Sequence, residues 1–114
     1  NTSSINHYPP YNIRKLNDTD YVIELAVAGF GKKDIEVKSV ENSLSIKSVD
    51  KKEEVLDKDE KIIHQGISKR SFKRSFTIAD DVVVKGADLK DGLLSVSLEK
   101  IIPEEKQPKV FTIK

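Results

Sequence analysis

The amino-acid sequence predicts an all-β protein folded as a β-sandwich. Apolar residues alternate with polar ones at a period of two from Tyr11 onward, as in strands with one buried face. Glycine, asparagine and proline separate these segments, and no segment has the periodicity of a core helix. About seven short strands divided by turns are typical of a sandwich.

The chain divides into one domain with two flanking segments. Its 114 residues are enough for one hydrophobic core and too few for two. Residues 1–10 are polar and end in Pro9-Pro10, and we expect a linker from an amino-terminal arm that precedes them. Residues 11–101 form the expected sandwich domain. Residues 102–114 contain two prolines and are expected to be an extended carboxyl-terminal tail.

The first half of the domain contains a strand and a hairpin. In residues 21–28 one strand face is apolar and the other is smaller and mixed, and Gly29-Phe30-Gly31 ends the strand. A second alternation over 35–46 is interrupted at Glu41-Asn42, where residues that tolerate positive φ indicate a hairpin turn. The apolar residues that alternate in these segments are Tyr21, Ile23, Leu25, Val27, Ile35, Val37, Leu44 and Ile46.

The second half begins with a charged segment. Residues 50–61 hold two apolar side chains among mixed charges, which predicts an exposed loop, and Ile62 and Ile63 at its far end are expected to make a brief strand. A further strand carries one cation, Arg74, on an otherwise apolar face. The last strong strand alternates three apolar residues with polar ones: Leu94, Val96 and Leu98.

Composition excludes several classes of partner. The 20 basic and 19 acidic residues leave a formal charge of 20 − 19 = +1, so a nucleic-acid partner is not expected. The absence of cysteine excludes a disulfide framework, a thiol nucleophile and a thiolate metal site, and is consistent with a cytoplasmic location. No apolar stretch approaches the ~20 residues that cross a bilayer, and no signal peptide is recognisable, so we expect a soluble protein with no membrane span.

No combination of residues predicts catalysis or a cofactor. His7 and His64 are expected to be ordinary exposed histidines, and two histidines alone are too few for a metal cage. Asp80-Asp81 is expected to form a turn, because adjacent residues on an extended chain point to opposite faces. Gly29-Phe30-Gly31 lacks the third glycine and the helix of a dinucleotide site. Residues 69–74 mix cations with an aromatic residue, but the neutral total charge disfavours a single-strand nucleic-acid platform.

Two features are unusual for a plain sandwich. Phe111 and Ile113 lie on the same side of the tail and predict a short motif that docks on an exposed sheet edge by strand addition. A final strand folded onto its own sheet is the alternative. Arg74 is either a surface residue at a sheet edge or a buried cation that needs a carboxylate, on its own or a partner subunit, and organises a subunit interface.

Several motifs resemble the small heat-shock protein (α-crystallin) family. Residues 86–94, GADLKDGLL, match the family signature of alanine, four variable residues, glycine, an apolar residue and leucine. Residues 72–78, FKRSFTI, resemble its Phe-x-Arg-x-Phe-x-Leu strand and place the family's characteristic arginine at Arg74. Residues 26–37 are similar to its Pro-Gly turn and the strand that follows. Together with residues 8–13, the resemblance covers nearly all of the chain after residue 7.

The departures from the family pattern are also informative. Ala28 and Ala79 stand where many members have proline, and the opening YPPYNI with Ala28-Gly29-Phe30 is most similar to the proteobacterial inclusion-body-binding branch. Phe111-Thr112-Ile113 replaces the usual Ile-x-Ile or Val-x-Ile tail motif with an aromatic first anchor. The family's hydrophobic amino-terminal arm is not in this chain.

The resemblance implies an immunoglobulin-like sandwich, the α-crystallin domain, of about seven to eight strands. It implies an ATP-independent holdase that is no enzyme, needs no cofactor, binds unfolding client proteins and limits their irreversible aggregation. Clients would pass to ATP-dependent disaggregating and refolding chaperones. The protein would form homodimers, by exchange of the 50–67 loop onto residues 11–16 of a partner, and larger homo-oligomers.

Site residues follow from the same resemblance. A groove for the tail or a client is implied between two edge strands, one with Val37 and Ser39 and the other with Val84 and Gly86. The dimer interface is implied at Arg74, Lys61, Ile62, Ile63 and His64. A monomeric co-chaperone-type adaptor that binds one folded partner is the alternative, and it would need neither the charged loop nor the tail motif. A sandwich enzyme or sugar-binding module would need a convergent polar site that the sequence does not supply.

Overall fold

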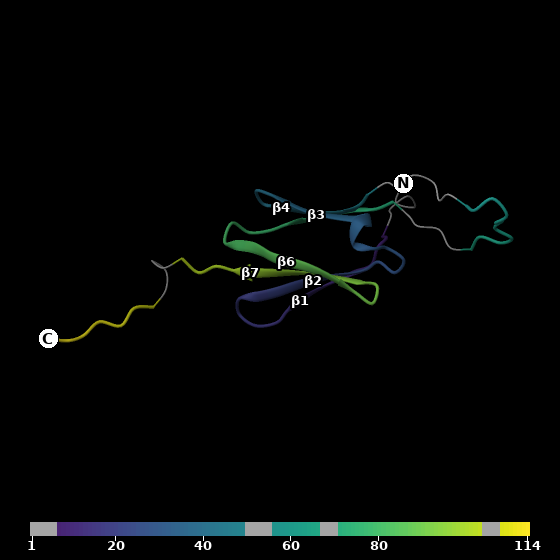
Figure 1. Ribbon diagram of the computed structural model, residues 1–114. Coiled ribbons are helices and arrows are strands. Elements are labelled where there is room, and N and C mark those ends of the chain that lie inside the picture. The colour runs from purple at the N-terminus through teal and green to yellow at the C-terminus, as the bar shows by residue number, and fades with distance from the viewer. Residues whose placement is uncertain (1–6, 50–55, 67–70, 104–107) are drawn as a thin grey trace.

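The computed structural model describes residues 7–49, 56–66, 71–103 and 108–114. Within these ranges seven strands form two antiparallel sheets packed face to face (Figure 1). One sheet has four strands in the order β1-β2-β7-β6 and the other has three in the order β3-β4-β5. The predicted all-β sandwich is therefore confirmed. The strands are β1 (Tyr11–Lys15), β2 (Asp20–Ala26), β3 (Ile35–Val40), β4 (Ser43–Ser48), β5 (Lys73–Thr77), β6 (Val82–Lys90) and β7 (Leu93–Lys100).

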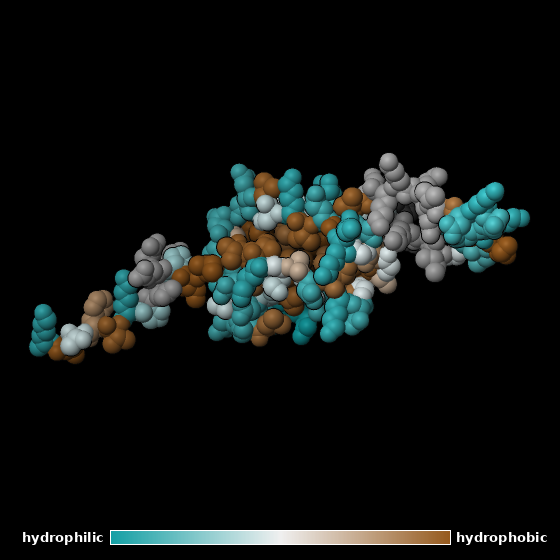
Figure 2. Space-filling model, viewed as in Figure 1, coloured by the Kyte–Doolittle hydropathy of each residue, from teal (hydrophilic) through white to brown (hydrophobic). Residues whose placement is uncertain are grey.

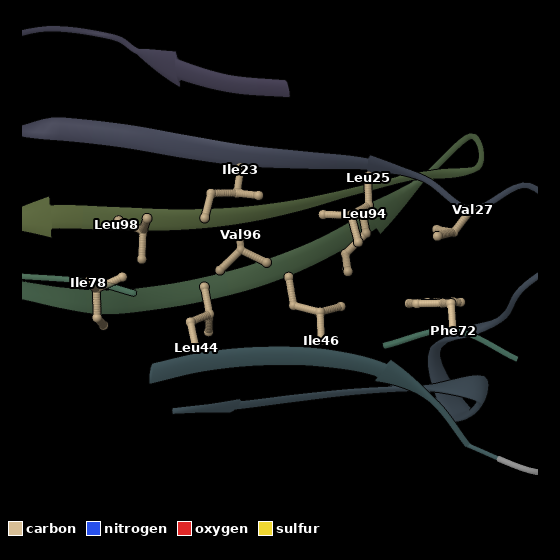
Figure 3. Close-up of a cluster of buried hydrophobic side chains, with 10 residues drawn as sticks. All are labelled: Ile23, Leu25, Val27, Leu44, Ile46, Phe72, Ile78, Leu94, Val96 and Leu98. Carbon is tan, nitrogen blue, oxygen red and sulfur yellow. The ribbon is translucent and has the colours of Figure 1, made fainter. Parts of the chain in front are cut away.

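A single hydrophobic core fills the space between the sheets (Figure 3). The central strands β2, β7 and β4 contribute most of it, because they have neighbours on both sides within their sheets. The period-two alternation predicted for β2, β4 and β7 is confirmed, since their inward residues are buried. The core residues are Ile23, Leu25, Val27, Leu44, Ile46, Phe72, Ile78, Leu94, Val96 and Leu98.

The turns follow the residues that favour them. Glu41 has a φ of 52° in the β3–β4 hairpin, as the Glu41-Asn42 pattern predicted. Residues 32–34 form a short 3₁₀ helix directly after the Gly29-Phe30-Gly31 segment that ends the preceding strand. The buried Asp34 caps that helix, because its Oδ2 accepts a hydrogen bond of 2.7 Å from the Gly31 amide. Asp80 and Asp81 lie in a turn, as expected.

The β6–β7 turn explains the glycine of the family signature. Asp91 and Gly92 both have positive φ, 52° and 77°, which is the backbone of a tight two-residue hairpin turn. A Cβ on Gly92 would lie 3.2 Å from the Cα of Ala28. The Gly92 carbonyl also accepts a hydrogen bond of 2.8 Å from the Val27 amide, so this turn is joined to the end of β2.

The segment before β1 is part of the folded unit. Pro9 is fully buried, and the ring of Tyr8 packs edge-to-face against Phe72 with centroids 6.0 Å apart. The Pro10 carbonyl accepts a hydrogen bond of 3.1 Å from the Ala26 amide. The end of the expected linker therefore closes one side of the sandwich.

The described part of the charged loop, residues 56–66, lies beyond one end of the sandwich (Figure 1). Ile62 and Ile63 are not in a strand, so the brief strand expected there is wrong for the isolated protomer. A strand needs a neighbouring edge to hydrogen-bond, and this segment projects beyond the sandwich, away from the described sheet edges (Figure 1). Ile63 remains 93% exposed.

Candidate functional site

An open groove lies between the edges of the two sheets. β3 is the edge of one sheet and β6 the edge of the other. The space between them has a volume of about 310 Å³. Figure 2 shows a band of apolar atoms across this face, between polar rims. The groove is lined by Lys32, Ile35, Val37, Ala87, Asp88, Leu89 and Leu94.

One of the four groove residues that the sequence analysis named lies in this lining. Val37 lines it, while Ser39 and Val84 lie on the same two strands outside the lining. Gly86 is displaced by a β-bulge between Val84 and Gly86. The inner face of β6 therefore continues at Ala87, which lies opposite the buried Val96 in the register, instead of at Gly86.

The tail does not fill this groove in its own protomer. Residues 108–114 form no strand and extend away from the sandwich (Figure 1). Phe111 is 79% exposed and Ile113 is 95% exposed. The alternative of a last strand folded onto its own sheet is therefore wrong for the described protomer.

Arg74 is half-buried on the inner side of β5 and binds backbone carbonyls. Its Nε and Nη2 donate to the Pro9 carbonyl at 3.1 and 2.9 Å, and Nη2 also donates to the His7 carbonyl. The guanidinium lies 4.9 Å from the ring centroid of Tyr11. We name residues 7–11 and Arg74 together the clasp.

The prediction of a carboxylate beside Arg74 in the same subunit is wrong for the described residues, because backbone carbonyl oxygens take that place. Pro9 and Pro10 lack amide hydrogens, so this segment cannot form a regular ladder with a neighbouring strand. Its carbonyl oxygens still need donors once they are buried, and the guanidinium supplies several in one plane. A role for Arg74 at a subunit interface stays a prediction.

A second groove lies on the opposite side of the sandwich, between the edges β1 and β5. It arises because the four-stranded sheet is one strand wider than the three-stranded sheet, so β1 overhangs and every residue of β1 is exposed. The groove has a volume of about 240 Å³. Its lining is uncharged and consists of Ile13, Tyr21, Ile23, Phe76, Thr77, Ile78, Ala79, Val82 and Leu98.

The residues predicted for loop exchange do not meet β1 in one protomer. β1 pairs only with β2, and Lys61, Ile62, Ile63 and His64 are all exposed in the projecting loop. Ile13 on β1 is 57% exposed. The structure therefore leaves both halves of the predicted contact uncovered.

The described residues contain no group of three or more side chains suited to hold a metal ion.

Asp80 accepts a hydrogen bond of 2.6 Å from the side-chain amide of Asn42, and Asn42 also donates to the Ile78 carbonyl at 2.9 Å. This pair therefore joins the β3–β4 hairpin to the end of β5.

In the part of the chain that the structure describes, no helix is long and apolar enough to cross a membrane.

Comparison with known proteins gives the class that this fold represents. The model of the Hsp20/alpha crystallin family matches residues 13–114, and the chain belongs to this family. Members of the family are ATP-independent chaperones and not enzymes. The chain therefore has a chaperone role, and the resemblance found in the sequence is confirmed.

Individual relatives narrow the comparison. The chain is 38% identical over 113 residues to the small heat shock protein IbpA of Pectobacterium carotovorum, which covers 99% of this chain and 80% of the relative. It is similar to the structure of the small heat shock protein AgsA from Salmonella typhimurium in a C-terminally truncated form, with a TM-score of 0.70, 31% identity, and coverage of 92% and 98% of the two chains. A small heat shock protein from Synechococcus phage S-ShM2 gives a TM-score of 0.66 at 40% identity, covering 93% and 99%.

Proposed function

We propose that this chaperone is a holdase, which binds partly unfolded proteins through the β3–β6 groove and limits their irreversible aggregation. One observation carries the proposal: the same protomer has an open apolar groove between two sheet edges and a solvent-exposed tail with two apolar anchors. Free edges bind extended chains by main-chain pairing, and pockets then select their side chains. An unfolded client and the tail of another subunit both fit that description.

Docking of one tail is expected to be weak. Burying Phe111 and Ile113 gains at most ~1.5 to 3 kcal/mol each. Ordering the tail and losing the freedom of a separate molecule offset much of that gain. A single tail therefore exchanges readily, and stable assembly needs several tails acting together.

The test replaces both anchors with glycine, in F111G/I113G. The matched control V110G/T112G also adds two glycines, on the side of the extended tail that faces away from the anchors. We expect the first variant, and not the control, to shift the assembly toward smaller species in sedimentation. A peptide copying residues 108–114 should cause the same shift in the parent protein and weaken its suppression of light scattering by a heated client without nucleotide. Unchanged assembly in both experiments would refute tail docking.

We propose a homodimer in which residues 61–64 of each subunit add to β1 of the other. The support is the uncovered β1 edge, the apolar β1–β5 groove beside it, and the exposed Ile62 and Ile63. The substitution I62S/I63S is expected to yield monomers in sedimentation, whereas K58S in the same loop is expected to leave the dimer intact. A dimer in both variants would refute the exchange, and a monomeric parent protein would favour the adaptor alternative.

The wider setting extends the same proposal. Clients released from a weak groove would pass to ATP-dependent disaggregating and refolding chaperones, because the chain has a binding surface for extended segments. We place this activity in the cytoplasm. Addition of an ATP-driven disaggregating system to client complexes should restore client activity, and no recovery above the chaperone-free control would contradict the transfer.

A further inference from the structure

We propose that Ala87 and Asp88 make the β3–β6 groove selective for an aromatic, lysine-flanked tail, the form that residues 108–114 of this chain have. This inference rests on the proposed tail docking and names the specificity of that groove. The occupant is the tail of a second copy, because the tail of the same protomer extends away from the sandwich.

The size of Ala87 carries the first step. The bulge at Val84/Gly86 turns Ala87 to the inner face of β6, opposite Val96. Val96 is completely buried, yet Ala87 is exposed, so the space above its methyl group is not filled by any other described part of the protomer. A small residue at this point leaves room for a large one from another chain, and Phe111 is the bulkier of the two tail anchors. We therefore assign Phe111 to the space above Ala87.

The walls of this space suit an aromatic ring. Ile35 and Val37 on β3 and Leu89 and Leu94 on the other sheet are all apolar. A ring inserted between them would be in contact with aliphatic side chains from both sheets. Such interdigitation is the usual way in which an interface anchor fills a pocket.

Charge carries the second step. The described tail contains Lys109 and Lys114 and no acidic residue. Asp88 borders the groove from its rim, because the register pairs it with Ser95 on the outer face of the sheet, and it makes no ion pair with another described residue. By contrast, Glu36 on β3 already lies 3.7 Å from Lys47. Asp88 is therefore available to a lysine beside the anchors, and Lys32 in the same lining disfavours additional cations elsewhere in the groove.

The experiment measures the affinity of a labelled peptide copying residues 108–114 by fluorescence anisotropy. The receptor is the full chain with F111G/I113G, so that its own tail does not compete. We expect A87L to weaken binding about tenfold or more, because overpacking excludes the ring. The control G86V adds bulk one residue away on the outer face, where nothing lies within 4 Å, and should leave affinity unchanged.

A double-mutant cycle identifies the contact. On the parent receptor, a peptide with Phe111→Ala should bind about tenfold more weakly than the parent peptide. On the A87L receptor, the affinities of these two peptides should differ by less than about twofold, because the ring has already lost its place there. D88N should weaken the parent peptide about two- to fivefold at low salt, and should not affect a peptide whose two lysines are glutamine. This second comparison stays informative if A87L fails to fold.

The outcomes separate this inference from the proposal on which it rests. No binding of the peptide to the parent receptor would refute tail docking itself. Binding that is equally strong in A87L, D88N and the parent receptor would leave tail docking intact and overturn the specificity. Loss in A87L together with an equal loss in G86V would also overturn it, because bulk on either face would then act through the strand.

Discussion

Replacement of Arg74 by alanine is expected to lower the free energy of unfolding by about 2 to 4 kcal/mol. The variant removes the donors to the Pro9 carbonyl, which belongs to a fully buried residue, and to the His7 carbonyl. An unsatisfied buried acceptor costs about 1 to 3 kcal/mol, and hydrogen bonds from a charged group contribute about 1.5 to 3 kcal/mol. These two figures describe the same lost interaction and are not added together. The lost contact with the Tyr11 ring adds about 0.5 to 1 kcal/mol.

The assay is urea unfolding at one fixed protomer concentration, followed by far-ultraviolet circular dichroism. Tyrosine fluorescence reports mainly on the clasp, because Tyr8 and Tyr11, two of the three tyrosines, lie in it and the chain has no tryptophan. R74K keeps the charge but loses the planar fork of donors, so it should fall between the parent protein and R74A.

The matched control is K47A. Lys47 lies 3.7 Å from Glu36 with both side chains 47% exposed, and such a pair contributes about 0.2 to 1 kcal/mol. A loss for R74A below about 1 kcal/mol, or no larger than that of K47A, would refute the reasoning. Arg74 would then not be holding the carbonyls of the segment before β1.

Two further predictions concern stability. G92A is expected to lower the free energy of unfolding by about 1 to 2 kcal/mol or more, because the φ of 77° at Gly92 disfavours a side chain and the new Cβ would lie 3.2 Å from Ala28. Thermal unfolding checks this against the control G86A, where the space around the new Cβ is open. Equal melting temperatures of the two variants would contradict the prediction. L44A is expected to cost about 2 to 5 kcal/mol, because Leu44 is fully buried between the sheets; urea unfolding should show this loss, and one below about 1 kcal/mol would mean that the core collapses around the cavity.

Inward positions could be predicted wherever a strand is regular. In β2 and β7 each inward residue follows the last by two positions, so Ile23, Leu25, Leu94 and Val96 were found from alternation alone. In β6 the groove residues came from the resemblance to the family instead, and there the bulge inserts one residue and puts Ala87, in place of Gly86, on the inward side. Gly86 is the one signal of the bulge in the sequence, since an isolated glycine within a strand often marks one, but pairing with β7 sets where the extra residue falls.

Long-range partners were the other gap. A cation on an apolar face identified Arg74 as unusual, but its partner is 65 residues away in the chain. The partner is also a pair of backbone carbonyls, which every residue has and no pattern reveals. What was visible is the cause: Pro9-Pro10 cannot donate amide hydrogens, so carbonyl oxygens packed beside them need a donor from elsewhere.

The arrangement of the free edges has a consequence for assembly. β1 and β6 are opposite edges of one sheet, so the two apolar grooves lie on opposite sides of the sandwich. The projecting loop and the tail also leave the sandwich at opposite ends (Figure 1). An exchange of loops across the β1 edges is reciprocal, and a reciprocal contact closes at two subunits.

A tail in a neighbour's groove is a contact of the other kind. It joins two different surfaces, so each subunit that donates a tail still has its own groove to receive another. On the proposed docking, such contacts would extend from dimer to dimer until a ring or shell closes, and each one would cover an edge that could otherwise aggregate. On the proposed weak docking of one tail, some grooves would be open at any moment, and these are the sites that an unfolding protein would meet first. Chaperone activity should therefore rise as tail affinity falls, because more grooves are then open to an extended client segment.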